Sequence, residues 1–212
     1  ERTRQTLSAY ALYVRNLMGD RDLAKARQLL SQTSLEALPL DAVGWLWQVL
    51  NAGACGTCAG GDPGSAGDLE AIARLVNNRA VETAGAANFT TDYAGACGSC
   101  AGDDQAYLLL ESDRRTDAIL LDALIAADPQ SDLIPKVVNG LLAHRSQGRW
   151  NNTQENVFVL LALDHYFATF EAQTPEFVAR IWLADTYVGG HQYAGRSTER
   201  HETTVPMSYL VD

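Results

Sequence analysis

The chain has 212 residues, of which 47% are hydrophobic, and 26 acidic against 16 basic side chains give a formal net charge of −10. This length can bury one sizeable core and part of a second domain. The acidity excludes nucleic acid as an expected partner, because a polyanion would be repelled. The sequence contains no apolar run of about 18 residues and no signal peptide. It begins inside an apolar pattern without an initiator methionine, so we expect a piece of a longer protein.

Apolar residues recur with helical spacing in seven segments, which predicts a mainly α-helical domain over residues 1–172. The segments are Thr6–Met18, Asp22–Leu30, the run after Pro39, Ser65 to about Thr83, Gln105–Ala127, Leu133–His144 and the run after Trp150. On the first helix we expect an inward face of Leu7, Tyr10, Ala11, Val14 and Leu17. On the last helix we expect an inward face of Val157, Leu160, Leu161, Leu163 and Phe167.

Polar residues at two helix starts have predicted structural roles. Asn152 and Glu155 form a capping-box pattern, in which each side chain satisfies a backbone N–H of the first turn. Asp113, Arg114, Arg115, Asp117 and Asp122 lie at ion-pair spacings on one helix, which favours partly buried ion pairs over acid–base catalysis. The four histidines are scattered, and we assign no catalytic residue.

After Pro175 the hydrophobic period changes from helical spacing to two, which predicts a β-strand segment. We expect a hairpin turn at Gly189-Gly190 and a further strand at Arg200–Leu210. This segment, residues 173–212, is too short to close a domain by itself. We therefore predict part of a β-sandwich whose other strands lie elsewhere.

All four cysteines lie in two nearly identical segments, AGACGTCAG at residues 52–60 and AGACGSCAG at residues 94–102. Each segment is a Cys-x-x-Cys turn flanked by small residues. Four thiolates in two such turns can close a tetrahedral site, which makes Cys55, Cys58, Cys97 and Cys100 candidate metal ligands. Structural zinc is the metal expected there, with an iron–sulfur cluster less favoured. Disulfides or redox couples formed by the same thiols remain an alternative.

Five stretches point to a known family: Asn77–Ala87, Ser112–Ala118, Leu133–Val138, Gly148–Leu163 and Gly195–Arg200. They resemble the bacterial alpha-2-macroglobulin family, specifically the second half of its thioester-containing helical domain. The resemblance implies an α/α toroid, with helices alternating between an inner and an outer ring, followed by a β-sandwich. It also implies a periplasmic or extracellular location, with membrane contact only through an N-terminal lipid anchor that this chain lacks.

Family members are protease traps, in which an internal Cys-Gln thioester captures the attacking protease. The motif Gly-x-x-Cys-x-Glu-Gln does not occur in this sequence, and cysteine stands where glutamine would be needed in both turns. The resemblance therefore implies a non-catalytic scaffold for a thioester located outside this chain, with proteases as partners through the parent protein. The alternative function is a metal-binding, disulfide or redox module grafted onto a helical scaffold. An oxidising periplasm would favour disulfides in that module.

Overall fold

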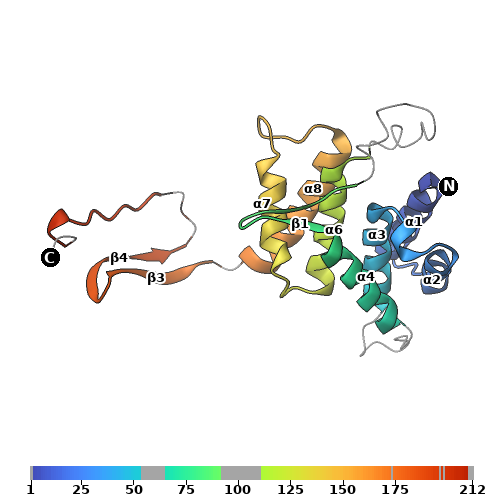
Figure 1. The fold of residues 1–212 in the computed structure, drawn as a ribbon, viewed down its shortest axis with the longest axis horizontal. Coiled ribbons are helices and arrows are strands. Elements are labelled where there is room, and N and C mark those ends of the chain that lie inside the picture. The colour runs from blue at the N-terminus through green and yellow to red at the C-terminus, as the bar shows by residue number, and fades with distance from the viewer. Residues whose placement is uncertain are drawn as a thin grey trace. The chain divides into compact units, whose positions relative to one another are not determined.

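A computed structural model describes residues 2–53, 65–91, 111–172, 174–195, 197 and 199–209. Contacts divide the chain into two units, Glu1–Tyr166 and Phe167–Asp212, which are treated separately below. The described residues form seven α-helices and, near the C-terminus, a short two-stranded antiparallel sheet (Figure 1). This confirms the predicted mainly α fold with a β segment after it. No described helix is long and apolar enough to cross a membrane.

Each predicted helical segment corresponds to one helix of the first unit. The helices are α1 (Arg2–Leu17), α2 (Leu23–Gln32), α3 (Leu40–Gly53), α4 (Ser65–Arg79), α6 (Asp113–Ala127), α7 (Leu133–Ala143) and α8 (Thr153–Tyr166). Two predicted boundaries change. Helix α4 ends at Arg79 rather than near Thr83, and the predicted start of α6 at Gln105 lies outside the described residues.

Four helices run parallel to one another: α1, α3, α6 and α8. Asp41 at the start of α3 contacts Arg115 at the start of α6, and Asn51 near the end of α3 donates to the Ala126 carbonyl near the end of α6. Helix α8 follows α6 in the same sense, because His165 near its end contacts Asp122 in the second half of α6. Helix α1 runs with α3, since Arg21, just beyond α1, donates to the Ala52 carbonyl.

The intervening helices α2, α4 and α7 run in the opposite sense. Gln5 at the start of α1 donates to Thr33 just after α2, whereas Arg15 at the end of α1 contacts Asp22 just before α2. The end of α7 likewise lies at the start of α6, where His144 contacts Arg114. Alternating senses of this kind are the packing that the expected α/α arrangement requires.

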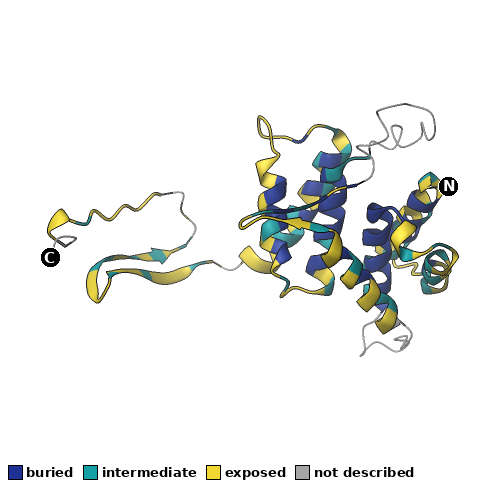
Figure 2. Cartoon of the chain, in the orientation of Figure 1, coloured by how far each residue is buried: buried dark blue, intermediate teal, exposed yellow. Residues whose placement is uncertain are grey.

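The core lies along α3 and α6, which are buried almost throughout (Figure 2). Trp45 and Trp47, two residues apart on α3, are both buried, so α3 is covered on more than one side. Aromatic rings from α1 and α8 meet over Trp45: its ring centroid lies 4.8 Å from that of Tyr10 and 5.8 Å from that of Phe158. Trp45 is therefore the point at which α1, α3 and α8 converge.

The predicted inward faces of α1 and α8 are confirmed only in part. Val14 and Leu163 pack against the core, and the Tyr10 ring lies on Trp45. Leu7 and Leu17 on α1 are 48% and 65% exposed, and Leu160 and Leu161 on α8 are 59% and 55% exposed. The buried residues are instead Gln5, Thr6, Ala9, Leu12 and Tyr13 on α1 and Glu155, Val159 and Ala162 on α8. Both helices have apolar residues on more than one side, so the packing partner decides which side is buried.

A short antiparallel hairpin, β1 (Ala80–Glu82) and β2 (Ala87–Phe89), crosses α6 and α7. The pairing of these two strands was not predicted from the sequence. A Cβ atom on Gly140 of α7 would lie 2.3 Å from the Ala87 carbonyl oxygen. Glycine at residue 140 is therefore required for the hairpin backbone to approach α7.

The second unit contains a short π-helix, η3 (Phe167–Glu171), and the hairpin of β3 (Glu176–Leu183) and β4 (Thr186–Ala194). The predicted turn at Gly189-Gly190 is wrong, because the turn lies at Ala184-Asp185. Gly190 instead lies inside β4, where a Cβ would be 2.7 Å from the Ala179 carbonyl oxygen. Described residues 199–206 form no strand, so the predicted strand there is also wrong. Apolar side chains are exposed on this hairpin, and a lone pair of strands is marginally stable.

We predict that Gly140→Ala lowers the free energy of unfolding by about 1 to 3 kcal/mol, because the new methyl group collides with backbone rather than with a movable side chain. Urea unfolding followed by circular dichroism measures this effect. Gly67→Ala on α4 is the matched control. A Cβ there has open space around it, so this variant should be unchanged or more stable by up to about 1 kcal/mol. Equal effects at residues 67 and 140 would contradict the close approach.

Candidate functional site

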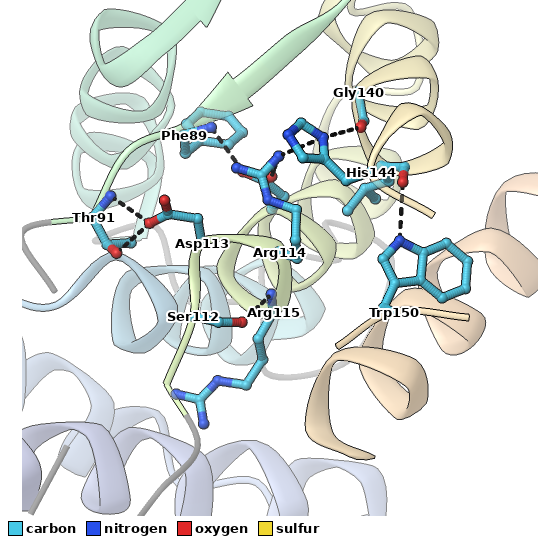
Figure 3. Close-up of polar contacts among 11 residues, drawn as sticks. Phe89, Thr91, Ser112, Asp113, Arg114, Arg115, Gly140, His144 and Trp150 are labelled. Atoms are coloured by element: carbon cyan, nitrogen blue, oxygen red, sulfur yellow. Dashed lines mark hydrogen bonds and ion pairs between the residues drawn. The ribbon is translucent and has the colours of Figure 1, made fainter. Parts of the chain in front are cut away.

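Charged and polar side chains concentrate at the start of α6, where Arg115 contacts α3. Figure 3 shows the contacts of the same region with the β1–β2 hairpin and with the end of α7. Ser112 caps the helix by accepting the backbone N–H of Arg115 at 3.2 Å. The polar residues that follow it, Asp113 to Asp117, were predicted to form ion pairs within this helix. The structure shows that most of their partners lie on other elements.

Arg115 forms a buried ion pair with Asp41 of α3. Both side chains are almost completely excluded from solvent, and the guanidinium also lies 5.8 Å from the centre of the Trp45 ring. Asp41 is the second residue of α3, and its carboxylate also accepts the Ala42 N–H at 2.8 Å. Burying either charge alone would cost several kcal/mol, so the pair holds α3 and α6 together at this point.

Arg114 lies between an aspartate of its own helix and a histidine of α7. Its Nη1 atom is 3.0 Å from Asp117 Oδ2 and 3.1 Å from His144 Nδ1. The contact with Asp117 is the predicted i,i+3 ion pair, but its geometry is not that of a hydrogen bond. That same Nδ1 atom is 2.8 Å from the Gly140 carbonyl oxygen. A single ring nitrogen cannot accept from arginine and donate to a carbonyl at once. One of the two contacts is therefore unsatisfied in either tautomer.

Two carboxylates of α6 hold the hairpin through its backbone. Asp117 Oδ1 accepts the Phe89 N–H at 2.7 Å, and Asp113 Oδ1 accepts the Thr91 N–H at 3.0 Å and the Thr91 hydroxyl. Residues four apart on a helix and residues two apart on an extended chain are both separated by roughly 6 to 7 Å. Because these two distances match, Asp117 and Asp113 on one face of α6 can bind the N–H groups of Phe89 and Thr91, which lie two residues apart on the extended chain.

Burial raises the pKa of Asp117 to about 7, against the lowering influence of Arg114 and of the Phe89 N–H. The carboxylate is almost fully buried, and its Oδ2 atom has no aligned hydrogen bond. Its ionised form is therefore stabilised less by the protein than by water.

The predicted Asn152 cap at the start of α8 is confirmed, whereas Glu155 accepts an N–H one residue further back than a capping box requires. The Glu155 N–H donates to Asn152 Oδ1 at 2.9 Å, and Glu155 Oε2 accepts the N–H of Asn151 at 2.8 Å. The indole N–H of Trp150 donates to the Leu141 carbonyl at 2.9 Å in the last turn of α7. Trp150 is buried, so it joins the end of α7 to the start of α8.

Two of the four histidines, His144 and His165, lie apart from the others, whereas His191 and His201 lie together. His144 belongs to the Arg114 contact, and His191 stacks on His201 in the second unit with ring centroids 3.4 Å apart. His165 Nδ1 lies 2.6 Å from Asp122 Oδ1, which orients the imidazole and leaves Nε2 as the free ring nitrogen. Tyr13 packs near this pair, and burial together with the nearby Asp122 charge raises its pKa to about 12.

The four predicted metal ligands, Cys55, Cys58, Cys97 and Cys100, all lie outside the described residues. The zinc, iron–sulfur and disulfide hypotheses therefore stay predictions. Within the described ranges, no cluster of three or more His, Asp, Glu or Cys side chains could hold a metal ion. The described ends nearest the two cysteine pairs, Gly53 and Thr91, lie at opposite ends of the parallel α3–α6 pair, roughly 20 Å apart for helices of this length.

The polar residues at the start of α6 have a structural role, because they connect α6 to the elements that pack against it. Arg114 and Arg115 are buried and contact side chains of Asp117, His144 and Asp41, and Asp113 and Asp117 accept backbone N–H groups of the chain at and after β2. The sequence signal was correct in type, because alternating charges did indicate ion pairs. It missed Asp41 as the partner of Arg115, since 74 positions separate the two residues.

Two curated proteins are similar to part of the chain. It is 33% identical over 112 residues to a Dictyostelium discoideum protein named Circularly permutated Ras protein 2, and 30% identical over 101 residues to an alpha-2-macroglobulin homologue of Nostoc sp.. Each match covers 48% of this chain, and the chain spans only 3% of the first relative and 5% of the second. No family model matches the chain. No solved structure matches it either.

We predict that Arg115→Met lowers the free energy of unfolding by about 3 to 5 kcal/mol, because it leaves the Asp41 charge buried without its partner. The double variant Asp41→Asn with Arg115→Met should recover part of this loss, since no lone charge remains. Urea unfolding of both variants tests the prediction. The matched control is Arg74→Met, which breaks an exposed i,i+4 pair with Glu70 and should cost about 0.5 kcal/mol or less. A double variant as unstable as the single one would contradict this account.

We predict that Asp117 makes the folded protein less stable as the pH rises from about 4 to about 7. Its folded pKa is raised above the ordinary value of 3.8, so the folded state retains a proton that the unfolded state loses in this window. The free energy of unfolding of the wild type, minus that of Asp117→Asn, should therefore decrease across the window by an amount on the order of a few kcal/mol.

Asp20 provides a control of opposite sign for urea unfolding between pH 3 and pH 8. Its hydrogen bond from Arg15 lowers the pKa of this exposed carboxyl, so the wild type should lose its advantage over Asp20→Asn as the pH falls. A wild-type minus Asp117→Asn difference that stayed flat, or that rose with pH, would contradict the assignment of Asp117.

Proposed function

We propose that this chain is a non-catalytic helical scaffold of a macroglobulin-like protease trap, with the thioester located outside residues 1–212. Three features support the proposal: the partial similarity to the Nostoc alpha-2-macroglobulin homologue, the alternating α/α helices, and the structural use of the α6 charges. Under this proposal the parent protein is an endopeptidase inhibitor in the periplasm or outside the cell. Its partners are proteases.

The main structural support for the proposal is that α1 and α8, the first and last of the four parallel helices, leave large apolar side chains exposed. Helix α1 exposes Leu7 and Tyr10, and α8 exposes Val157, Leu160 and Leu161. A group of large apolar side chains exposed on one helix marks a place where another element packs. Further α/α helices of the parent protein are the occupant that fits, because α1, α3, α6 and α8 already pack side by side as parallel neighbours. In this arrangement the scaffold completes its ring only within the parent.

The test uses the parent protein and a protease such as trypsin. A trap should block cleavage of a large protein substrate while leaving cleavage of a small chromogenic peptide nearly unchanged, because only small molecules reach an enclosed protease. Leu160→Gln with Leu161→Gln should weaken this size selectivity in the parent. The same substitutions should change the stability of the 212-residue chain by no more than about 0.5 kcal/mol, since both side chains are exposed there.

Loss of size selectivity in the variant parent, with the short chain unaffected, would support the scaffold role. Equal inhibition of both substrates, or none of either, by the wild-type parent would refute the trap. Equal destabilisation of the short chain and the parent would refute the packing role of the α8 face.

A further inference from the structure

The α1–α2 hairpin has the opposite charge to the rest of the molecule. Residues 2–33 contain six basic side chains, Arg2, Arg4, Arg15, Arg21, Lys25 and Arg27, and two acidic ones, Asp20 and Asp22. The hairpin thus carries a formal charge of +4, from six minus two, in a chain whose net charge is −10. A local concentration of one sign on an oppositely charged molecule directs complementary ligands to that place.

A groove of about 470 Å³ lies between these two helices. Among the described residues, its lining contains three basic side chains, Arg4, Arg15 and Lys25, and no acidic one. Because α1 and α2 are antiparallel, Arg4 lies at the end of the groove where Gln5 contacts Thr33. Arg15 and Lys25 lie at the other end, around Asp22.

The two ends differ in how far their charges are balanced. Arg15 pairs with Asp20 at 2.8 Å and Asp22 at 3.1 Å, and Lys25 lies 3.8 Å from Asp22. Arg4 is exposed and makes no ion pair with any described residue. The Arg4 end of the groove therefore has a guanidinium available for a ligand. At the opposite end, Arg15 and Lys25 are partly neutralised by Asp20 and Asp22 but have further N–H groups that could bind a carboxylate.

The middle of the groove combines apolar and hydrogen-bonding groups. Ala11, Leu12 and Leu29 supply apolar surface, and Ser8 and Gln28 supply a hydroxyl and an amide. These groups suit a peptide with one small apolar side chain and a backbone that needs hydrogen-bond partners. No aromatic side chain lines the groove, so it has no platform on which a nucleic-acid base could stack.

We propose that the α1–α2 groove binds an extended acidic peptide segment, with one carboxylate near Arg4, a second near Arg15 and Lys25, and an apolar side chain between them. Eleven positions on α1 separate Arg4 from Arg15, which is roughly 16 Å along a helix. An extended peptide covers that distance in about five residues. The proposal rests on α1 and α2 alone and does not depend on the parent being a protease trap.

Fluorescence anisotropy on the 212-residue chain tests the proposal with a labelled peptide of sequence EGLGGE at low ionic strength. The groove variant is Arg4→Gln with Lys25→Gln, and its affinity should fall by about tenfold, the effect of losing two exposed charge contacts. The matched control is Arg74→Gln with Arg180→Gln, which removes the same charge outside the groove and should bind like the wild type. Circular dichroism confirms that both variants are folded.

Two further probes define the ligand class. A KGLGGK peptide should not bind, and a single-stranded oligonucleotide should bind more weakly than EGLGGE. The proposal is overturned if the groove variant binds EGLGGE as tightly as the wild type, or if the control variant loses as much affinity. Tighter binding of the oligonucleotide through Arg4 and Lys25 would also overturn it, in favour of a nucleic-acid site.

Discussion

The helical unit depends on one buried ion pair, between Asp41 and Arg115. Two full charges can leave water at tolerable cost only in mutual contact, so the start of α3 must adjoin the start of α6. That contact sets the two helices side by side in the same sense. Arg115 also lies against Trp45, on which Tyr10 and Phe158 pack, so α1 and α8 take their positions from the same point.

The β1–β2 hairpin binds to α6 because the spacing of two aspartates on the helix matches the spacing of two N–H groups on the extended chain. Asp113 and Asp117 present carboxylates one helical turn apart, and Thr91 and Phe89 present N–H groups one strand repeat apart. The carboxylates thus replace the neighbouring strand that an edge would otherwise need. The arrangement leaves Asp117 with a buried charge that its partners compensate incompletely, which is why its pKa is raised.

The sequence predicted which segments are helical far better than which sides of them are buried. Helical spacing, the Asn152 cap and the alternating charges of α6 are local signals, and each has its counterpart in the structure. The partner of Arg115 and the pairing of β1 with β2 are decided by tertiary contacts, which spacing does not encode. The predicted cysteine site lies outside the described residues.

Helix α1 shows why a single amphipathic pattern failed there. Its buried stripe holds Thr6, Ala9 and Tyr13, a second stripe of Leu7, Tyr10 and Leu17 is apolar yet partly exposed, and a third, Arg4, Ser8, Ala11 and Arg15, lines the groove with α2. A helix that packs on one side can be read from one apolar face. A helix whose three sides have different contacts cannot be read in this way, because its most hydrophobic residues can be among its most exposed ones, as Leu7 and Leu17 are. The misassigned face on α1 is therefore itself a sign that this helix serves more than the core.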